Sequence, residues 1–266
     1  MRFTIFGSTG YLGSSLIEKF KADNIEYDAP DLRNKKNLEE NLGHVIYAIG
    51  VPNFKQFPSK AIDAHVILLN KLLNETNFES FLYLSSTRIY HNASSTDERA
   101  NLLVNPLDEN NLYNISKIMG EAICNSSKKS NVRIVRLSNV TGKNFNSNLF
   151  LPSIILESLR SKKITLQTNL QSEKDYVYID DVVDILPKIS LHGNDSTYNV
   201  ASGKNTTNEQ IVKELQKITG CEVEVAKNAT KYSFPTISIE KIQNEFDFKP
   251  TSILDKFDEI VNEYKK

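Results

Sequence analysis

The sequence has few cysteines, almost no net charge and no long apolar run, and each shortage excludes a class of protein. Its 266 residues include only two cysteines, Cys124 and Cys221. These two thiols suggest neither a disulfide framework nor a zinc site, so a reducing compartment fits best. The net charge of −1 gives no general attraction to nucleic acid or to an anionic membrane.

No apolar run is long enough to span a bilayer. The chain enters a strand pattern at Phe3, which leaves no room for a signal peptide. We therefore expect a cytoplasmic protein with no membrane or nucleic-acid partner. The four histidines share no metal-ligand spacing, so we expect no metal. The 39% hydrophobic and 24% charged residues suit one large α/β domain, or one domain with a small lobe.

The first thirteen residues, MRFTIFGSTGYLG, carry the most informative motif. A β-rich strand pattern at 3–6 is followed by Gly7, Gly10 and Gly13, and then by a helix pattern. This order is typical of the opening of a dinucleotide-binding βαβ unit. Gly7 permits the turn, Gly10 lets a pyrophosphate approach the backbone, and Gly13 lets the helix pack closely. The helix N-terminus offers free N–H groups to phosphates. An ordinary βα turn is the alternative.

Strand and helix patterns alternate along the rest of the first half. This alternation predicts an α/β fold with a doubly wound parallel sheet. Ligands of such sheets lie beyond the C-terminal strand ends. The predicted strands are 25–29, 44–50, 81–86 and 132–140, and the predicted helices are 36–41, 61–76 and 112–127.

Two polar patterns follow the glycine motif. Tyr113 and Lys117 are spaced i, i+4 and share a helix face. A nearby ammonium lowers the pKa of a phenol, which favours Tyr113 as a general acid/base. Ser85, Ser86 and Thr87 end a buried strand, where a hydroxyl donates to a substrate carbonyl oxygen. A surface Tyr/Lys pair and a simple turn are the alternatives.

With these features in order, the chain resembles the extended short-chain dehydrogenases/reductases, specifically the NAD(P)-dependent sugar-nucleotide epimerase/dehydratase family. The stretches that carry the resemblance are GSTGYLG, YAIG, YLSSTRIY, YNISK, RLSNVTG, KDYVYIDDVVD, YNVASG and FDFKPT. It implies an NAD(P)-binding Rossmann domain over 1–143, to which segments at about 175–200 return, and a mainly substrate-binding C-terminal lobe over 144–266. It also implies NAD or NADP, a nucleotide-sugar substrate and a homodimer built from the helices at 61–76 and 112–127.

By position, the resemblance makes Tyr113 the catalytic acid/base, and Lys117 the residue that lowers its pKa and holds the nicotinamide ribose. Ser86 polarises the substrate, with Thr87 as the alternative if the register differs by one. The implied substrate-binding residues are Ser86, Thr87, Asn139 and Lys174. The implied cofactor-binding residues are Gly7, Thr9, Gly10, Tyr11, Leu12, Gly13, Asp31, Leu32, Ala48, Gly50, Tyr113 and Lys117.

Several positions depart from the family pattern. Family dehydratases carry an Asp-Glu pair after the catalytic Thr, whereas Thr87-Arg88 follows Ser86 here, which argues against dehydration. Fucose-synthase-like enzymes have a cysteine where this chain has Arg88, which argues against the double epimerisation that those enzymes carry out. Lys174 replaces a frequent arginine and binds a phosphate without bidentate geometry. The second predicted strand lacks a clear acidic residue for the adenosine 2′-hydroxyl, for which Asp28 is a poor candidate. Arg33 suits a 2′-phosphate, so the choice between NAD and NADP stays open.

We therefore predict an enzyme that reduces a 4-keto sugar nucleotide in surface-polysaccharide or deoxysugar biosynthesis. A sugar-nucleotide 4-epimerase uses the same residues and is the alternative within the family. A non-catalytic, NADPH-sensing regulatory protein of the same fold is the alternative from another class. Replacement of Tyr113 by Phe separates the enzyme from the sensor.

Overall fold

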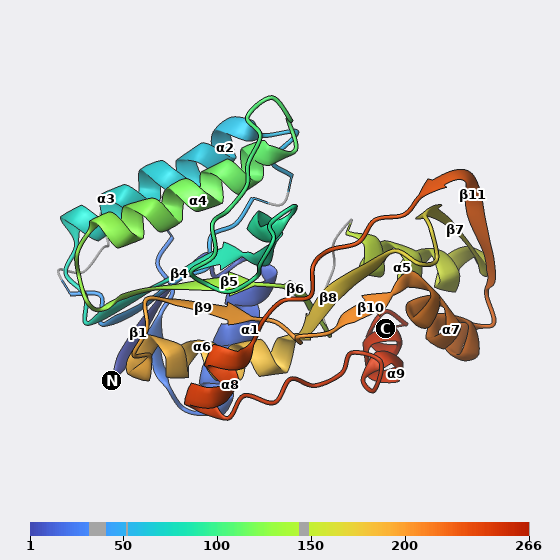
Figure 1. Cartoon of the computed structure of the whole chain (residues 1–266). Coiled ribbons are helices and arrows are strands. Elements are labelled where there is room, and N and C mark those ends of the chain that lie inside the picture. The colour runs from blue at the N-terminus through green and yellow to red at the C-terminus, as the bar shows by residue number, and fades with distance from the viewer. Residues whose placement is uncertain (32–40, 52, 144–148, 266) are drawn as a thin grey trace.

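A six-stranded parallel sheet with helices on both faces forms the larger part of the molecule (Figure 1). The computed structural model describes residues 1–31, 41–51, 53–143 and 149–265. The strand order is β2-β1-β3-β4-β5-β9, and the predicted doubly wound Rossmann fold is confirmed. The strands are β1 (Arg2–Phe6), β2 (Glu26–Asp28), β3 (His44–Tyr47), β4 (Ser80–Ser86), β5 (Val132–Leu137) and β9 (Thr197–Val200).

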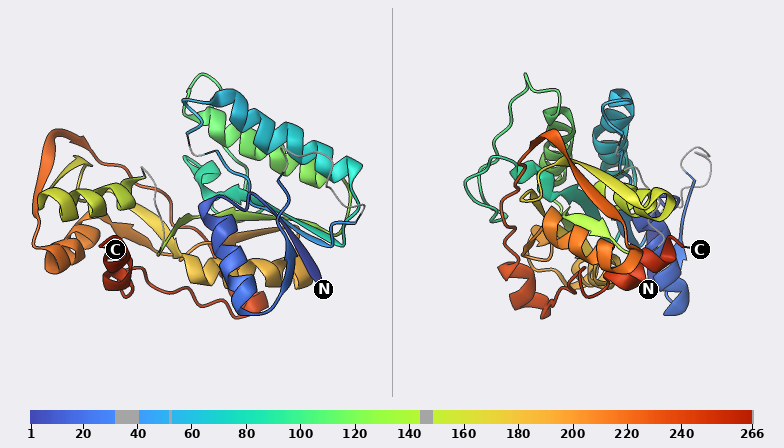
Figure 2. Two further views of the ribbon diagram at one scale, coloured as in Figure 1. Left: turned by 180° about the vertical axis from the view of Figure 1, so that it is seen from behind. Right: turned by 90° about the vertical axis from the view of Figure 1, so that its right-hand side faces the viewer.

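Helices α1 (Tyr11–Ala22) and α6 (Ile179–His192) cover one face of this sheet. The other face carries α2 (Pro58–Ile62), the π-helix η2 (Asp63–Leu68), α3 (Leu69–Glu75) and α4 (Asn111–Ser126) (Figure 2). Apolar side chains that alternate along the strands fill both interfaces. On the α1 side, the rings of Phe3 and Phe20 pack 4.9 Å apart.

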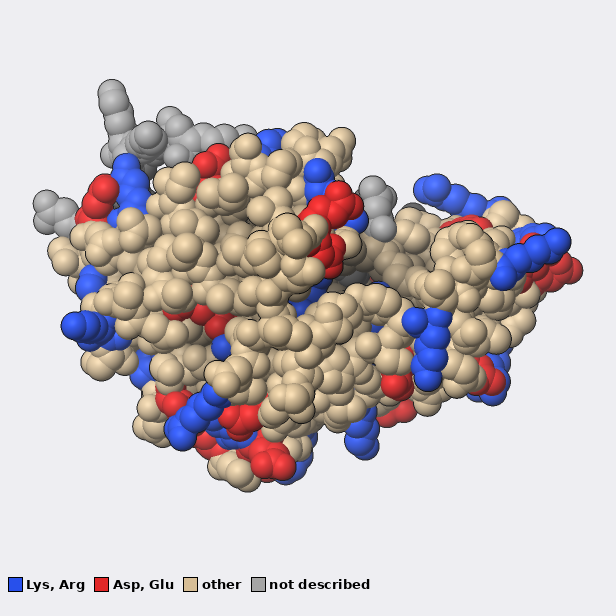
Figure 3. Space-filling view, turned by 45° about the horizontal axis from the view of Figure 1, so that its top comes forward, with Lys and Arg blue, Asp and Glu red and all other residues tan. Residues whose placement is uncertain are grey.

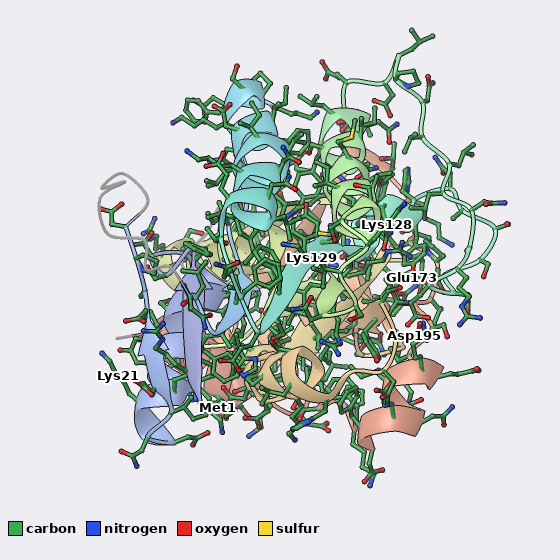
Figure 4. The ribbon with its side chains drawn as sticks, turned by 90° about the vertical axis from the view of Figure 1, so that its left-hand side faces the viewer. Met1, Lys21, Lys128, Lys129, Glu173 and Asp195 are labelled. Carbon is green, nitrogen blue, oxygen red and sulfur yellow. The ribbon has the colours of Figure 1, made fainter. Side chains whose placement is uncertain are left out.

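The end of α3 is tied to the chain that follows α4. Seen from the side in Figure 4, both helices stand above the sheet, and Lys128 and Lys129 follow the end of α4. The Lys129 Nζ donates to the Leu73 carbonyl oxygen over 2.7 Å, which satisfies a carbonyl of the last turn of α3. The two helices therefore act as one layer over the sheet.

The smaller lobe is built from short sheets and helices of the second half. Its three-stranded sheet has the order β10-β8-β6, and its other sheet pairs β11 with β7 in parallel. The strands are β6 (Asn139–Thr141), β7 (Lys163–Thr168), β8 (Glu173–Tyr178), β10 (Asn205–Thr207) and β11 (Glu222–Thr230). The helices are α5 (Phe150–Ser161), α7 (Asn208–Thr219) and α9 (Phe257–Glu263).

The chain crosses between the two parts more than once. After β8 it returns through α6 to β9 in the main sheet, and then leaves again for β10. Helix α8 (Glu240–Phe246) packs beside β9, where Glu245 accepts a hydrogen bond of 2.8 Å from the Tyr198 hydroxyl. The last helix, α9, then contacts α7 in the lobe. These crossings hold the two parts in one body. Within the described ranges, no helix is long and apolar enough to cross a membrane.

Candidate active site

The turn between β1 and α1 presents bare backbone to a cavity. Gly7 has a φ of +90°, and a Cβ there would lie 2.8 Å from the Ala48 carbonyl carbon. A Cβ on Gly13 would lie 2.2 Å from the Gly7 carbonyl oxygen. Gly10 is the N-cap residue of α1 and has no side chain that could accept a hydrogen bond from the helix. The first turn of α1 holds no acidic residue. The N–H groups and positive end of the helix therefore stay available, and the turn fits the pyrophosphate of a dinucleotide.

A first cavity of about 550 Å³ opens beside this turn. It lies beyond the C-terminal ends of β1 and β3, where the sheet order reverses direction, which is the usual ligand position of such folds. Most of the predicted cofactor residues line it: Gly7, Thr9, Gly10, Tyr11, Leu12, Ala48, Gly50 and Tyr113.

The other predicted cofactor residues lie elsewhere. Gly13 packs behind the turn against Gly7, and Lys117 is buried beneath the site. Asp31 is not among the lining residues of either cavity. Leu32 lies outside the described residues, as do Arg33 and 36–40 of the predicted polar helix.

A second cavity of about 410 Å³ adjoins the first and reaches the lobe. Figure 3 shows the hollow between the two parts of the molecule on this face. Its wall carries Ser86, Thr87, Arg88 and Asp175, together with five aromatic or apolar residues of distant segments. The residues common to both cavities are Tyr113, Ser138, Asn139, Leu149 and Lys174. Tyr113 thus stands where a ligand in one cavity meets a ligand in the other.

The Tyr113 hydroxyl is held at this junction by its neighbours. Burial raises the pKa of Tyr113, while a hydrogen bond with the Ser86 side chain and the charge of Arg88 act in the opposite direction. The Arg88 guanidinium carbon lies 5.6 Å from the centroid of the Tyr113 ring. Ser86 and Tyr113 are therefore within reach of one common oxygen atom of a ligand, as a proton donor and its partner require.

Lys117 lies one turn further along α4 and is 3% exposed. Its Nζ donates to the Leu84 carbonyl oxygen over 2.8 Å and lies 6.0 Å from the Tyr113 ring centroid. Burial lowers the pKa of Lys117 to about 7, against the opposing charge of Glu121. The charge that lowers the pKa of Tyr113 here is that of Arg88. The role that the resemblance gives to Lys117 stays a prediction.

His65 of the π-helix supports Tyr113 from behind. Its ring meets the Tyr113 ring edge-on, with centroids 5.5 Å apart. The Ser116 hydroxyl donates its proton to the Tyr113 carbonyl oxygen. The same hydroxyl therefore accepts a hydrogen bond from His65, whose Nδ1 lies 2.9 Å from Ser116 Oγ. The Nε2 is buried without a hydrogen-bond partner in the described part of the chain. Nothing in the sequence indicated this contact between His65 and Tyr113.

A buried ion pair fixes α4 on β5 behind the site. Arg136 donates to both carboxylate oxygens of Glu121, with Nη2 2.7 Å from Oε2, and both side chains are 6% exposed. The Arg136 Nη1 also donates to the Tyr90 hydroxyl over 2.6 Å, and Tyr90 donates to Asn199 Oδ1 over 2.9 Å. A buried network of hydrogen bonds therefore joins α4 to β5 and, through Tyr90, to β9.

Sequence reasoning missed the aromatic wall of the second cavity. Phe54 precedes α2, whereas Tyr232 and Phe234 follow β11 at the far end of the lobe. His91 stacks on Tyr232 with ring centroids 5.5 Å apart and does not itself line the cavity. No local motif marks these residues, because only the return of the chain from β11 brings them to the site.

The glycine turn and the paired cavities at the strand ends define a Rossmann fold with the form of a dinucleotide-binding site. The NAD dependent epimerase/dehydratase family matches residues 3–201, and the chain belongs to that family. It is therefore an enzyme of the NAD(P)-dependent sugar-nucleotide epimerase/dehydratase class, and the predicted cofactor, NAD or NADP, is that of the family.

Known relatives are distant but extend over most of the chain. The UDP-glucose 4-epimerase of Mycoplasma genitalium is 23% identical, with 94% of this chain and 92% of that protein covered. UDP-glucuronic acid decarboxylase 3 of Arabidopsis thaliana is also 23% identical, with coverages of 85% and 76%. The solved structure of TunA, an NAD dependent NDP-hexosamine 5,6-dehydratase, superimposes with a TM-score of 0.81 at 18% identity and covers 100% of this chain and 98% of that one. This last likeness shows the fold.

Proposed function

We propose that the protein reduces a 4-keto sugar nucleotide. The observation that supports this best is the position of Tyr113, which lines the first cavity with the glycine turn and the second with Ser86. When bound, NADH or NADPH supplies the hydride. Gly7, Gly10 and the N-terminus of α1 would hold its pyrophosphate, and Lys117 its nicotinamide ribose.

The residues of the second cavity then act on the sugar nucleotide. The Ser86 hydroxyl donates a hydrogen bond to the keto oxygen, and Tyr113 transfers its proton to that oxygen as negative charge develops there. Lys174 binds a phosphate, and Asn139 positions the sugar nucleotide. Arg88 follows Thr87 in the position where dehydratases carry a carboxylate, so this chain has no acid or base in that place to expel water.

A 4-epimerase is the second candidate, and its support comes from the relatives. The M. genitalium protein, which matches 94% of this chain, is named a UDP-glucose 4-epimerase. Such an enzyme oxidises and then reduces the same carbon, so Tyr113 would first accept and later return the proton. The cofactor would stay bound throughout.

The experiment follows the near-ultraviolet absorbance of NADH and NADPH mixed with the protein and a panel of 4-keto sugar nucleotides. Repeated consumption of one cofactor supports the reductase and identifies the cofactor. No consumption, with NAD retained through purification and UDP-glucose converted to UDP-galactose, supports the epimerase. No binding of either cofactor would contradict both.

We also propose that the chain forms a homodimer through α2, η2 and α4. These elements pack together on one face of the sheet, and their outer surface exposes Ile62, Ile67 and Met119 by 41%, 57% and 50%. A shared apolar surface of this kind is a common site of self-association. We further propose a cytoplasmic location, with which the two free, buried cysteines agree. The role that we propose for the reaction is in surface-polysaccharide or deoxysugar biosynthesis.

A further inference from the structure

We infer that Thr96 and Asn199 form a clasp between the Rossmann domain and the smaller lobe, and that this clasp positions the aromatic wall of the second cavity for a sugar nucleotide. The inference rests on the proposed function and adds two positioning residues to it. It comes from the hydrogen bonds that these two side chains make to a segment near the other end of the chain.

The segment at residues 232–238, called the strap below, connects β11 of the lobe to α8 beside the main sheet (Figure 1). The strap residues that line the second cavity are Tyr232, Phe234, Pro235 and Ile237. Lobe residues hold the first part of the strap. The Tyr232 amide donates to Ser172 Oγ over 3.0 Å, and Asn205 Nδ2 donates to the Phe234 carbonyl oxygen over 2.7 Å. The last part of the strap is bonded to the Rossmann domain instead.

Thr96 holds the strap from the loop that follows η3 (Thr87–Tyr90), and its side chain is buried. Its hydroxyl donates to the Thr236 carbonyl oxygen over 2.8 Å and accepts from the Ser238 amide over 2.9 Å. One hydroxyl thus satisfies two backbone groups of the strap, which lie 140 and 142 residues further along the chain. Removal of the hydroxyl would leave both backbone groups without this partner, which disfavours the present position of the strap.

Asn199 on β9 joins the loop and the strap to the main sheet, and it is completely buried. Its Nδ2 donates to the Thr96 carbonyl oxygen over 2.8 Å and to the Ser238 carbonyl oxygen over 3.0 Å. Its Oδ1 accepts from the Tyr90 hydroxyl, and its backbone N–H donates to Glu98 Oε1 over 3.0 Å. The amide of Asn199 is therefore used on both sides, and a buried amide with all these partners fixes the segments in one arrangement.

The same network reaches the helix that carries Tyr113. The Tyr90 hydroxyl accepts from Arg136, and the Arg136 guanidinium pairs with Glu121 of α4. Glu121 lies about two turns along α4 from Tyr113. The strap and Tyr113 are therefore fixed to one framework, and the clasp sets where the aromatic wall lies relative to Tyr113.

The first test measures calorimetric binding of NAD and NADP to the full chain, and of UDP-, dTDP- and GDP-glucose to the chain with its cofactor. Thr96→Val keeps the shape of the side chain and removes the hydroxyl. We expect it to weaken binding of the sugar nucleotide by about three- to thirtyfold, as the loss of a buried hydrogen-bonding group does. The affinity for the cofactor should stay within about twofold, because the glycine turn is untouched. In turnover, KM should rise and kcat should stay within about twofold. Thr96→Ser should restore the affinity, because it keeps the hydroxyl.

Thr219→Val is the matched control. Thr219 is as buried as Thr96, donates to the Leu215 carbonyl oxygen over 2.8 Å and accepts from the Cys221 amide over 3.3 Å. These partners are its neighbours in the lobe, so the variant loses similar hydrogen bonds without releasing the strap. It should bind the sugar nucleotide as the unchanged protein does. An equal loss of affinity in the two variants, or a loss of cofactor affinity in Thr96→Val as large as that for the sugar nucleotide, would overturn the inference.

A second readout follows the strap itself and needs no ligand. The chain has no tryptophan, so Tyr232→Trp places a single fluorophore on the strap, at a position that is 38% exposed. Acrylamide should quench its emission more strongly when Thr96→Val is added, and no more strongly when Thr219→Val is added. Unchanged quenching in the variant with Thr96→Val would overturn the clasp, whatever the protein binds. If the quenching increases as expected but the unchanged protein binds none of the three sugar nucleotides, the clasp stands and the proposed function fails.

Discussion

At the scale of single residues, the site combines a tyrosine with three basic side chains that differ in exposure. Lys117 and His65 are buried, whereas Arg88 reaches the second cavity. Burial penalises the charged form of each buried group, so both have a lowered pKa. The charge that lowers the pKa of Tyr113 is that of Arg88. Arg88 follows Thr87 at a position where the sequence departs from the family dehydratases.

His65 predicts how stability depends on pH. Burial, with a smaller contribution from the Lys117 charge, lowers its pKa from 6.5 to about 3. Between these values the unfolded chain binds a proton that the folded protein does not, so stability falls as pH falls through this window, by at most about 1.4 kcal/mol per pH unit. Urea unfolding at pH 7 and pH 5 should show this loss, and His65→Asn should show a smaller one. An equal pH dependence in the two proteins would contradict the account.

At the scale of elements, the sequence was sufficient to predict the strand–turn–helix unit at the N-terminus. It was not sufficient to predict the form of the helix expected over 61–76. That segment starts at Pro58 and widens into a π-helix at Asp63–Leu68. The Tyr47 hydroxyl donates to the Ala64 carbonyl oxygen over 2.5 Å, inside the hydrogen-bond ladder of the widened turn. Helical periodicity records which residues are apolar, and it carries no information about such an insertion from a neighbouring strand.

The glycine turn gives a prediction with an internal control. Gly13→Ala places a Cβ 2.2 Å from the Gly7 carbonyl oxygen, whereas Gly50 has nothing within 4 Å of a Cβ. We expect Gly13→Ala to lower the free energy of unfolding by about 1–3 kcal/mol and to weaken cofactor binding. Gly50→Ala should change the free energy of unfolding by less than about 0.5 kcal/mol. Denaturant titration and cofactor fluorescence measure both quantities. Equal stability of the two variants would show that the turn is not closely packed.

At the scale of the whole molecule, the alternation of strand and helix patterns was enough to predict the Rossmann fold, because each strand and helix is formed by residues that are close in sequence. The second cavity depends on residues from Phe54 to Ile237, brought together by repeated crossings between domain and lobe. Tyr232 and Phe234 could not be assigned from the sequence, since nothing near them resembles a motif. Most of the residues predicted to bind the cofactor line one cavity, because the turn that holds most of them is contiguous in sequence.

The proposed dimer is tested at this scale. A charge on the exposed apolar face of η2 and α4 must be desolvated when two copies meet, so the double variant Ile67→Glu, Met119→Glu should be monomeric. Val225→Glu, on β11 of the smaller lobe and 40% exposed, is the control and should keep the dimer. Sedimentation equilibrium should give twice the chain mass for the unchanged protein. A monomer at every concentration would contradict the proposal.

The most direct test of the account replaces the Tyr113 hydroxyl alone. Tyr113→Phe should lower turnover of the sugar nucleotide by about 10²–10⁴-fold, the usual contribution of a general acid. The cofactor should still bind, because the glycine turn is untouched. Tyr27→Phe, on β2 and away from both cavities, should keep full turnover. Undiminished turnover in Tyr113→Phe would contradict the central role given to this residue, and a protein that binds cofactor but turns over no sugar nucleotide in either form would be a sensor.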